Sequence, residues 1–244
     1  KLGYYLSQMI DNMSSRGPDS AGFAIYNSNN NNELCKFSLC VPQNFNINSL
    51  IKDCKKNFKD IKFKHLSDHL IITTSAKTEK FIKFIHNNYI DISIVGFGRS
   101  IEIFKQVGNP KDVVKKFKLD SFSGTHGIGH TRMATESATT VNGSHPYSTG
   151  EDECLVHNGS LSNHNNLRRT LIKKGNIFHS ENDTEVAAGY ISEKLKEKSL
   201  KETLADSLRD LDGFYTFIAG TKNGFAILRD EIGCKPAVIA ETKD

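Results

Sequence analysis

The sequence predicts an α+β protein in which strands and helices form separate layers. Apolar runs typical of strands come in neighbouring pairs, and stretches with helical periodicity follow one another, whereas a parallel βαβ fold would alternate the two. A chain of 244 residues is long enough for one large domain with its own core. The sequence contains no phosphate-binding loop, dinucleotide fingerprint, HExxH pattern or calcium loop, so we expect neither a metal nor a cofactor.

The N-terminal part should begin with an amphipathic helix over roughly fifteen residues, because Leu6, Ile10 and Met13 lie at helical spacing and Pro18 blocks its continuation. Apolar runs at 21–26 and 34–40 flank an Asn-rich turn, a pattern that predicts a β-hairpin. The middle of the chain carries no chemical motif, and there we expect helices at 48–58, 79–87 and 110–117 and strands at 69–74 and 92–97.

The second half alternates strand pairs with a run of helices. Asn163 should cap the first of these helices, and Gly213 should follow the end of the last. The expected elements are strands at 128–131 and 154–157, helices at 163–174, 183–198 and 201–211, and strands at 214–220, 225–229 and 237–240.

Charge and cysteine usage exclude several classes of protein. The net charge is only +4, and basic residues alternate with acidic ones as in EKLKEKSLKE from Glu193, so we expect no nucleic-acid partner. Every apolar run is far shorter than the roughly eighteen residues of a membrane span, so we expect no membrane association. The five cysteines show no CxxC spacing, which indicates reduced thiols in a cytoplasmic protein.

Two polar bursts, GHTRMAT at 129–135 and VHNG at 156–159, each follow or contain a few apolar residues, an arrangement that delivers side chains to a cleft. Arg132 offers a planar cationic fork for a carboxylate, with the Thr135 hydroxyl nearby. Asn158 and Gly159 could direct two N–H donors at one oxygen, as an oxyanion hole requires. The alternative is that each burst is an ordinary surface turn.

Further segments argue against the interpretation of the two polar bursts as ordinary surface turns. The chain carries RGPDSAG at 16–22, GHTRMAT at 129–135, HNGSLSN at 157–163, NDTE at 182–185 and RDEIGCKP at 229–236. This ordered set resembles the class II glutamine amidotransferases, whose glutaminase domains carry RGxDSAG, GHxRxAT, HNGxxxN, a TDTE-like element and RDxxGxKP. A narrower resemblance is to the stand-alone amidotransferase subunits of glutamate-synthase-like and N-methylglutamate-synthase-like enzymes. It rests on the segments HTRMATES, SHPYSTG and CLVHNGSLSNHNNLR.

The resemblance implies the four-layer αββα sandwich of the N-terminal nucleophile hydrolases. It implies one amidotransferase domain over 1–244, with an inserted segment at about 42–120, and we expect this domain to be incomplete at both ends. The four histidines at 126, 130, 145 and 157 are expected to be structural, because this chemistry needs no imidazole base.

The implied site roles fall into three groups. For substrate binding, Arg132 would bind the α-carboxylate of glutamine, Asp183 its α-amino group, and Thr135 would assist. Asn158 and Gly159 would form the oxyanion hole. Arg16 and Asp19 would brace the N-terminal strand.

The nucleophile of this family is a cysteine at residue one of the mature chain, whose own α-amino group, with a pKa near 8, handles the proton. Lys1 instead opens the sequence within the first predicted helix, and none of the five cysteines stands in the required segment. We expect a cysteine upstream of Lys1, and loss of the nucleophile is the alternative.

The implied function is that of a glutaminase subunit, which hydrolyses glutamine to glutamate and delivers ammonia to a separate synthase subunit in a hetero-oligomer. Two alternatives stay open. One is a non-catalytic regulatory or scaffolding subunit with the same fold. The other is the amidotransferase domain of a larger fused enzyme, such as asparagine synthetase or a phosphoribosyl-pyrophosphate amidotransferase.

Overall fold

The computed structural model describes residues 1–27, 34–134 and 139–242. Its helices are α1 (Leu2–Asn12), α2 (Ile47–Asn57), α3 (Thr78–Asn88), α4 (Pro110–Lys116), the 3-10 helix η1 (Leu119–Ser121), α5 (His164–Lys173), α6 (Asp183–Leu195) and α7 (Leu200–Asp210). Its strands are β1 (Ser20–Tyr26), β2 (Cys35–Cys40), β3 (Lys62–Leu66), β4 (His69–Thr74), β5 (Ser93–Gly98), β6 (Ile101–Val107), β7 (His126–Arg132), β8 (Cys154–Leu161), β9 (Gly213–Thr221) and β10 (Gly224–Arg229).

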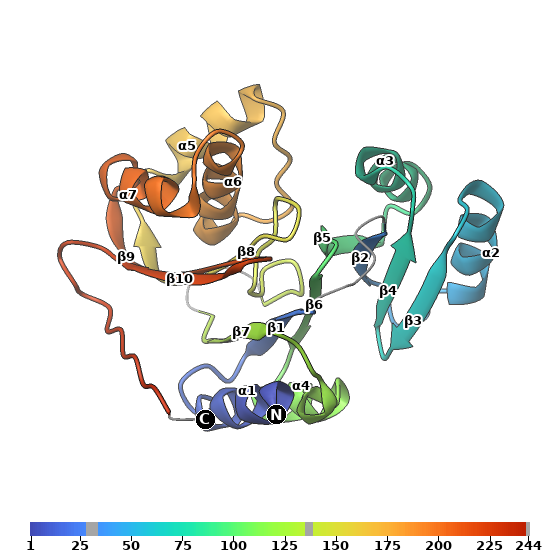
Figure 1. Cartoon of the computed structure of the whole chain (residues 1–244), viewed down its shortest axis with the longest axis horizontal. Helices are drawn as coiled ribbons and strands as arrows, with labels where there is room; N and C mark the ends of the chain where they lie inside the picture. The colour runs from blue at the N-terminus through green and yellow to red at the C-terminus, as the bar shows by residue number, and fades with distance from the viewer. Residues whose placement is uncertain (28–33, 135–138, 243–244) are drawn as a thin grey trace.

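Two antiparallel sheets form the centre of the molecule, one with the order β6-β1-β7 and the other with the order β10-β9-β8. Helices α1 and α4 cover the outer face of the first sheet, and α5, α6 and α7 cover the outer face of the second (Figure 1). The layers therefore follow the order αββα, which confirms the predicted α+β sandwich.

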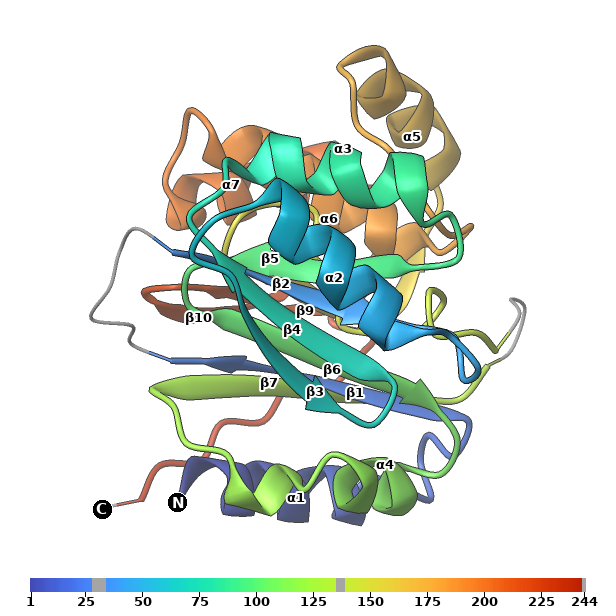
Figure 2. The same cartoon turned by 90° about the vertical axis from the view of Figure 1, so that its right-hand side faces the viewer.

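Each layer boundary has its own apolar core. Residues such as Tyr26, Ile128 and Val156 fill the space between the two sheets. Leu6 and Ile10 of α1 pack on β7 at Gly129, where a Cβ atom would lie only 2.8 Å from Cδ1 of Ile10. The missing side chain of glycine thus allows α1 to lie close beneath the sheet, as Figure 2 shows.

The predicted hairpin of 21–26 and 34–40 is wrong, although both strands exist. β1 pairs with β6 and β7, while β2 pairs with β4 and β5 in a separate four-stranded sheet of order β3-β4-β2-β5. Every residue of β1 is buried, so the strand needs partners on both edges, and those partners come from distant segments. The strands β3 and β6 were not predicted at all.

The segment 42–120 supplies α2, α3 and three strands of the four-stranded sheet. Together with β2 it encloses an apolar core that includes Phe37, Leu50 and Phe81. It also supplies β6, which pairs with β1 at the centre of the sandwich from Ser20↔Val107 to Tyr26↔Ile101. The single domain with an insertion at 42–120 stays a prediction from the family resemblance.

Two smaller predictions also fail. Residues 237–240 form no strand, and Val238 and Ile239 are exposed with no strand beside them in the described part of the chain. Asn163 does not cap α5 with its side chain, which instead donates to the Asp210 carbonyl oxygen at 2.9 Å and accepts from the Asp212 N–H at 3.1 Å. That side chain therefore joins the start of α5 to the end of α7.

None of the helices in the described ranges combines the length and the apolar character needed to cross a membrane. All five cysteines are free thiols, as their spacing predicted.

Candidate functional site

Strands β7 and β8 belong to different sheets, face each other across the inter-sheet core and run in the same direction. At their beginning, Nε2 of His126 lies 2.9 Å from the carbonyl oxygen of Thr221, which ends the neighbouring β9. Near their end, Nε2 of His130 lies 3.2 Å from the carbonyl oxygen of His157. The two polar bursts of the sequence therefore meet at one end of the sandwich.

The alternation of side chains along each strand shows which residues face the space between the sheets. On β7, the His126 ring stacks on Tyr26 and Ile128 belongs to the inter-sheet core, so Arg132 ends the row on this face. On β8, Cys154 and Val156 belong to the same core, so Asn158 ends their row. Arg132 is 8% exposed and Asn158 is exposed, and both lie at the open end of the inter-sheet space.

The backbone of β8 directs a free N–H group to the same side. The peptide groups of Leu155, His157 and Leu161 point away from β9 and bond to Tyr147, His130 and Asp183, respectively. Gly159 lies two residues from His157 and from Leu161, so its N–H group also points away from β9. This N–H group has no acceptor among the described residues. An open N–H group at a strand edge is one of the donors that an oxyanion hole would require.

Only glycine fits at this position. Gly159 has a φ of +148°, and a Cβ atom there would collide with the carbonyl oxygen of Phe214 and approach Nε2 of His157 to 2.8 Å. The bare backbone lets the strand edge stay open beside the exposed Asn158 side chain.

Asp183 is the first residue of α6, and its carboxylate reaches back to the end of β8. Oδ2 accepts from the N–H group of Leu161 at 2.9 Å, and Oδ1 lies 3.6 Å from Nδ1 of His157. Burial favours a higher pKa for Asp183, but the hydrogen bond and charge of His157 and the Leu161 N–H group outweigh it and lower the pKa. The helix cap is Asn182, which accepts from Thr184 N–H at 2.9 Å, so Asp183 is not that cap.

A buried histidine cluster supports this end of β8. The hydroxyl of Thr184 lies 2.9 Å from Nε2 of His145 and 3.1 Å from Nδ1 of His157, and the His145 ring stacks on His130 with centroids 4.0 Å apart. Burial lowers the pKa of His130 to about 4 and that of His145 well below its usual value. His130 and His145 are therefore neutral at physiological pH and act as packing and hydrogen-bonding groups.

The segment around Arg132 is fixed by Asp19. Its N–H group donates to the Arg132 carbonyl oxygen at 3.0 Å, and its Oδ2 accepts from the Ala134 N–H group at 2.7 Å. Arg16 is exposed, and its guanidinium makes no hydrogen bond or ion pair within the described ranges. Thr135, expected to assist substrate binding, lies outside the described residues.

The fifth motif, at 229–236, lies against the same end of β8. Thr216 of β9 pairs with Asn158 and donates its hydroxyl to the Lys235 carbonyl oxygen at 3.1 Å. The Asp230 carboxylate accepts from the N–H groups of Tyr215 and Gly233, which fixes the loop to β9. The sequence motif signalled this loop, but its position beside Asn158 became visible only in the fold.

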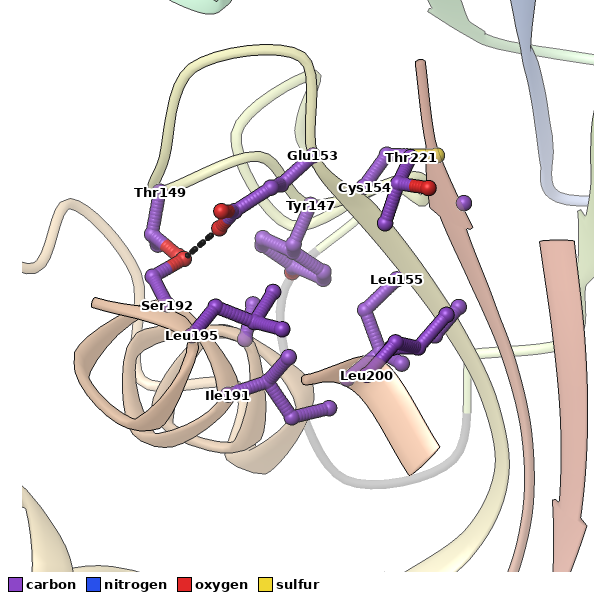
Figure 3. A pocket seen from close by; sticks show the side chains of 13 residues that line it. Tyr147, Thr149, Glu153, Cys154, Leu155, Ile191, Ser192, Leu195, Leu200 and Thr221 are labelled. Carbon is purple, nitrogen blue, oxygen red and sulfur yellow. Dashed lines mark hydrogen bonds between the residues drawn. The ribbon is translucent and has the colours of Figure 1, made fainter. Parts of the chain in front are cut away.

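A small cavity between β8 and α6 is not a candidate for substrate (Figure 3). Its volume is about 10 Å³, room for at most one water molecule. Ser192 bridges Thr149 and Glu153 along one wall, with distances of 2.7 and 2.6 Å. The remaining lining is mainly apolar, so this space is a packing gap in the helix layer.

Comparison with known proteins identifies the family of this chain. A family model described as a glutamine amidotransferase domain matches residues 130–244. The glutamine amidotransferase-like protein GlxB of Rhizobium meliloti is 48% identical over 99% of this chain and 81% of its own length. A putative glutamine amidotransferase of Methanothermobacter thermautotrophicus is 31% identical over 100% of this chain and 84% of its own length. The chain belongs to the glutamine amidotransferase family.

The fold is also found in a solved structure, that of the allosteric regulatory enzyme of purine biosynthesis. The two share 20% sequence identity and superpose with a TM-score of 0.51 over 90% of this chain, which spans 32% of that longer chain. At this identity the likeness concerns the fold alone, the αββα sandwich of the N-terminal nucleophile hydrolase type.

Proposed function

We propose that this chain is the glutaminase unit of an amidotransferase, which hydrolyses the side-chain amide of glutamine to give glutamate and ammonia. The observation that carries the proposal is the open N–H group of Gly159 beside Asn158, at the end of the sandwich where Arg132 and Asp183 also lie. Two donors placed where negative charge develops stabilise the tetrahedral intermediate of acyl transfer.

Arg132 and Asp183 would bind the two charges of the glutamine backbone. A guanidinium pairs with the α-carboxylate, and a carboxylate whose pKa is lowered is ionised and pairs with the α-ammonium group. Thr135 would assist Arg132, and Arg16 and Asp19 would brace the N-terminal strand. Asp19 already holds the peptide groups on both sides of Met133, next to Arg132.

The nucleophile in this proposal is an N-terminal cysteine upstream of Lys1. Its thiolate attacks the amide carbon, ammonia leaves with a proton supplied through the α-amino group, and water then hydrolyses the thioester to glutamate. Cys154 is unsuited to that role, because it is buried against Tyr26 and burial raises the pKa of its thiol to about 12.

The ammonia would pass to a separate synthase subunit of the glutamate-synthase-like or N-methylglutamate-synthase-like kind, within a hetero-oligomer. Support comes from the motif resemblance and from the GlxB relative, of which this chain covers 81%. We place the protein in the cytoplasm, with glutamine as substrate and without a cofactor, nucleic acid or membrane as partner.

Ammonia release by two forms of the protein tests the proposal. We expect a chain extended to a free N-terminal cysteine to release ammonia and glutamate from glutamine, and the chain that begins at Lys1 to be inactive. The Cys234→Ser variant of the extended form should keep its activity, because Cys234 lies in the exposed loop of the fifth motif. Equal release by both forms would contradict the nucleophile assignment.

An extended form that folds and binds glutamine without hydrolysing it would favour the regulatory or scaffolding subunit instead.

A further inference from the structure

A second cavity, of about 310 Å³, lies between the four-stranded sheet unit and the sandwich. Figure 1 shows α3 and β5 on one side of this region and α6 on the other. The volume falls within the range of small-molecule binding sites. Its lining includes Lys105, His86, His179, Asn142 and Ser148, but none of the candidate glutamine-site residues at 132, 158, 159 and 183.

The notable group in this cavity is the buried lysine. Lys105 is 3% exposed, and its side chain faces the same side of β6 as Ile101 and Ile103. Its ammonium donates to the carbonyl oxygens of Ser144 at 2.9 Å and Pro146 at 3.4 Å. The ammonium also lies over the Tyr147 ring, 4.8 Å from its centroid, in a cation–π contact. Two of its three N–H donors are therefore bonded to oxygen acceptors, and the third has none among the described residues.

No carboxylate forms an ion pair with Lys105 within the described ranges. Burial lowers the pKa of Lys105 to about 8, although the charge of Glu185 opposes that shift. The lysine is therefore still mainly protonated at neutral pH. Two carbonyl oxygens and the face of Tyr147 offset only part of the cost of burying this cation, and an anionic oxygen at hydrogen-bond distance would offset the rest.

Glu185 also lines the cavity, but its carboxylate is already held. The N–H groups of His179 and Ser180 donate to it at 2.8 and 2.7 Å, and the Ser180 hydroxyl donates at 2.7 Å. These three donors come from the loop before α6 and disperse the carboxylate charge. Glu185 therefore anchors that loop and leaves Lys105 as the charged group without an ionic partner.

The rest of the cavity lining has an apolar part and a polar part. β5 and the residues before it contribute an apolar wall that includes Ile90, Ile92, Ile94 and Val95. The segment 142–148 contributes amide and hydroxyl groups near Lys105, and His86 and His179 lie 5.6 Å apart between their ring centroids. A ligand with one anionic head and a short apolar body would match both halves.

We propose that this cavity binds a small organic carboxylate, with its head on the ammonium of Lys105 and its apolar body along β5. The site is separate from the proposed glutamine site and does not depend on glutaminase activity. Asp183 and Glu185 share the first turn of α6, but one carboxylate bonds to Leu161 and the other to residues 179 and 180.

Calorimetric titration of the full chain with 4-methylpentanoate tests the site, and the neutral isostere 4-methylpentanamide serves as the matched ligand. We expect saturable binding of the carboxylate and binding of the amide that is roughly thirty-fold weaker or more, since the buried charge pair is lost. Lys105→Met should weaken carboxylate binding to the same extent. Lys115→Met, at an exposed position of α4, should leave it unchanged.

Ser93→Phe gives a second variant that leaves the charge in place. Ser93 shares its face of β5 with Val95, so the larger side chain should fill the cavity and abolish binding without a large change in melting temperature. Equal affinity for acid and amide, no saturable binding at millimolar concentrations, or unchanged binding in both variants would overturn the proposal. Equal binding of inorganic phosphate would refute the apolar body assigned to the ligand.

Discussion

His130 of β7 donates its Nε2–H to the carbonyl oxygen of His157 of β8, at 3.2 Å. A carbonyl oxygen can only accept, so this contact fixes the tautomer of His130 and leaves its buried Nδ1 without a partner in the described structure. The bond joins the two sheets two residues before Arg132 on one strand and two residues before Gly159 on the other. It thereby places the proposed carboxylate-binding group level with the proposed oxyanion donor.

The first prediction concerns the pH dependence of stability. The pKa of His130 falls from 6.5 to about 4 on folding, so between these values the unfolded chain binds the extra proton. The stabilisation is complete above pH 6.5 and is lost as the pH falls to about 4, a change on the order of 3 kcal/mol. Urea unfolding across this range should show a smaller loss for His130→Gln than for the unchanged protein.

His65→Gln is the control, because His65 is exposed on β3 and should retain the full pH dependence. The same pH slope in His130→Gln and the unchanged protein would show that His130 is not the group responsible.

The second prediction concerns Asn158. In the form with an N-terminal cysteine, Asn158→Ala should lower kcat about a hundred-fold and change KM little, because an oxyanion donor acts on charge that develops in the transition state and contributes about 3 kcal/mol. Steady-state ammonia release measures both constants. Asn166→Ala on the exposed part of α5 is the matched control. A raised KM with an unchanged kcat would refute the oxyanion role.

The third prediction concerns the charge on Asp183. Asp183→Asn keeps an oxygen that can accept from Leu161 N–H but removes the charge that would pair with the substrate ammonium. Loss of one side of a desolvated charge pair costs about 2–5 kcal/mol, so glutamine affinity should fall at least thirty-fold in a protein whose nucleophile is replaced by Ser. Arg132→Ala should have the same effect from the other end of the ligand.

Calorimetric titration measures these affinities, and melting temperatures show whether folding is intact. Asp212→Asn, an exposed residue after α7, should bind glutamine normally. Near-normal affinity in Asp183→Asn would mean that Asp183 only connects α6 to β8.

The fourth prediction concerns Gly159, the glycine of the proposed oxyanion hole. Gly175→Ala, at a φ of +93° with no atom within 4 Å of a Cβ, should lose about 1 kcal/mol through backbone strain alone. Gly159→Ala carries comparable strain and a collision with the Phe214 carbonyl oxygen, so it should lose a further 1–3 kcal/mol or so. Denaturant unfolding compares the two. Equal losses would show that the edge of β8 moves aside freely.

Much of the local structure could be predicted because its causes lie within a few residues. The α1 stripe of Leu6 and Ile10, the strands β7 and β8, and the helices α6 and α7 all appear where the periodicity indicated. The missed strand β6 alternates apolar Ile101 and Ile103 with Glu102, a short pattern in a region without other signals. The apolar run at 237–240 resembled a strand, but a strand also needs a partner edge.

The sequence by itself determined the motifs, their order along the chain and the residues proposed to carry the chemistry, because motif spacing is a property of the chain alone. Only the tertiary structure decided that β1 lies between β6 and β7, so that Ser20 pairs with both Val107 and Arg132. The tertiary structure alone also left the Gly159 N–H group without an acceptor at the edge of β8 in the described structure, and placed Lys105 in a cavity beside residues 142–148. Propensities act over a few neighbouring residues, whereas strand pairing and layer packing join segments a hundred residues apart, and local sequence does not encode which edges meet.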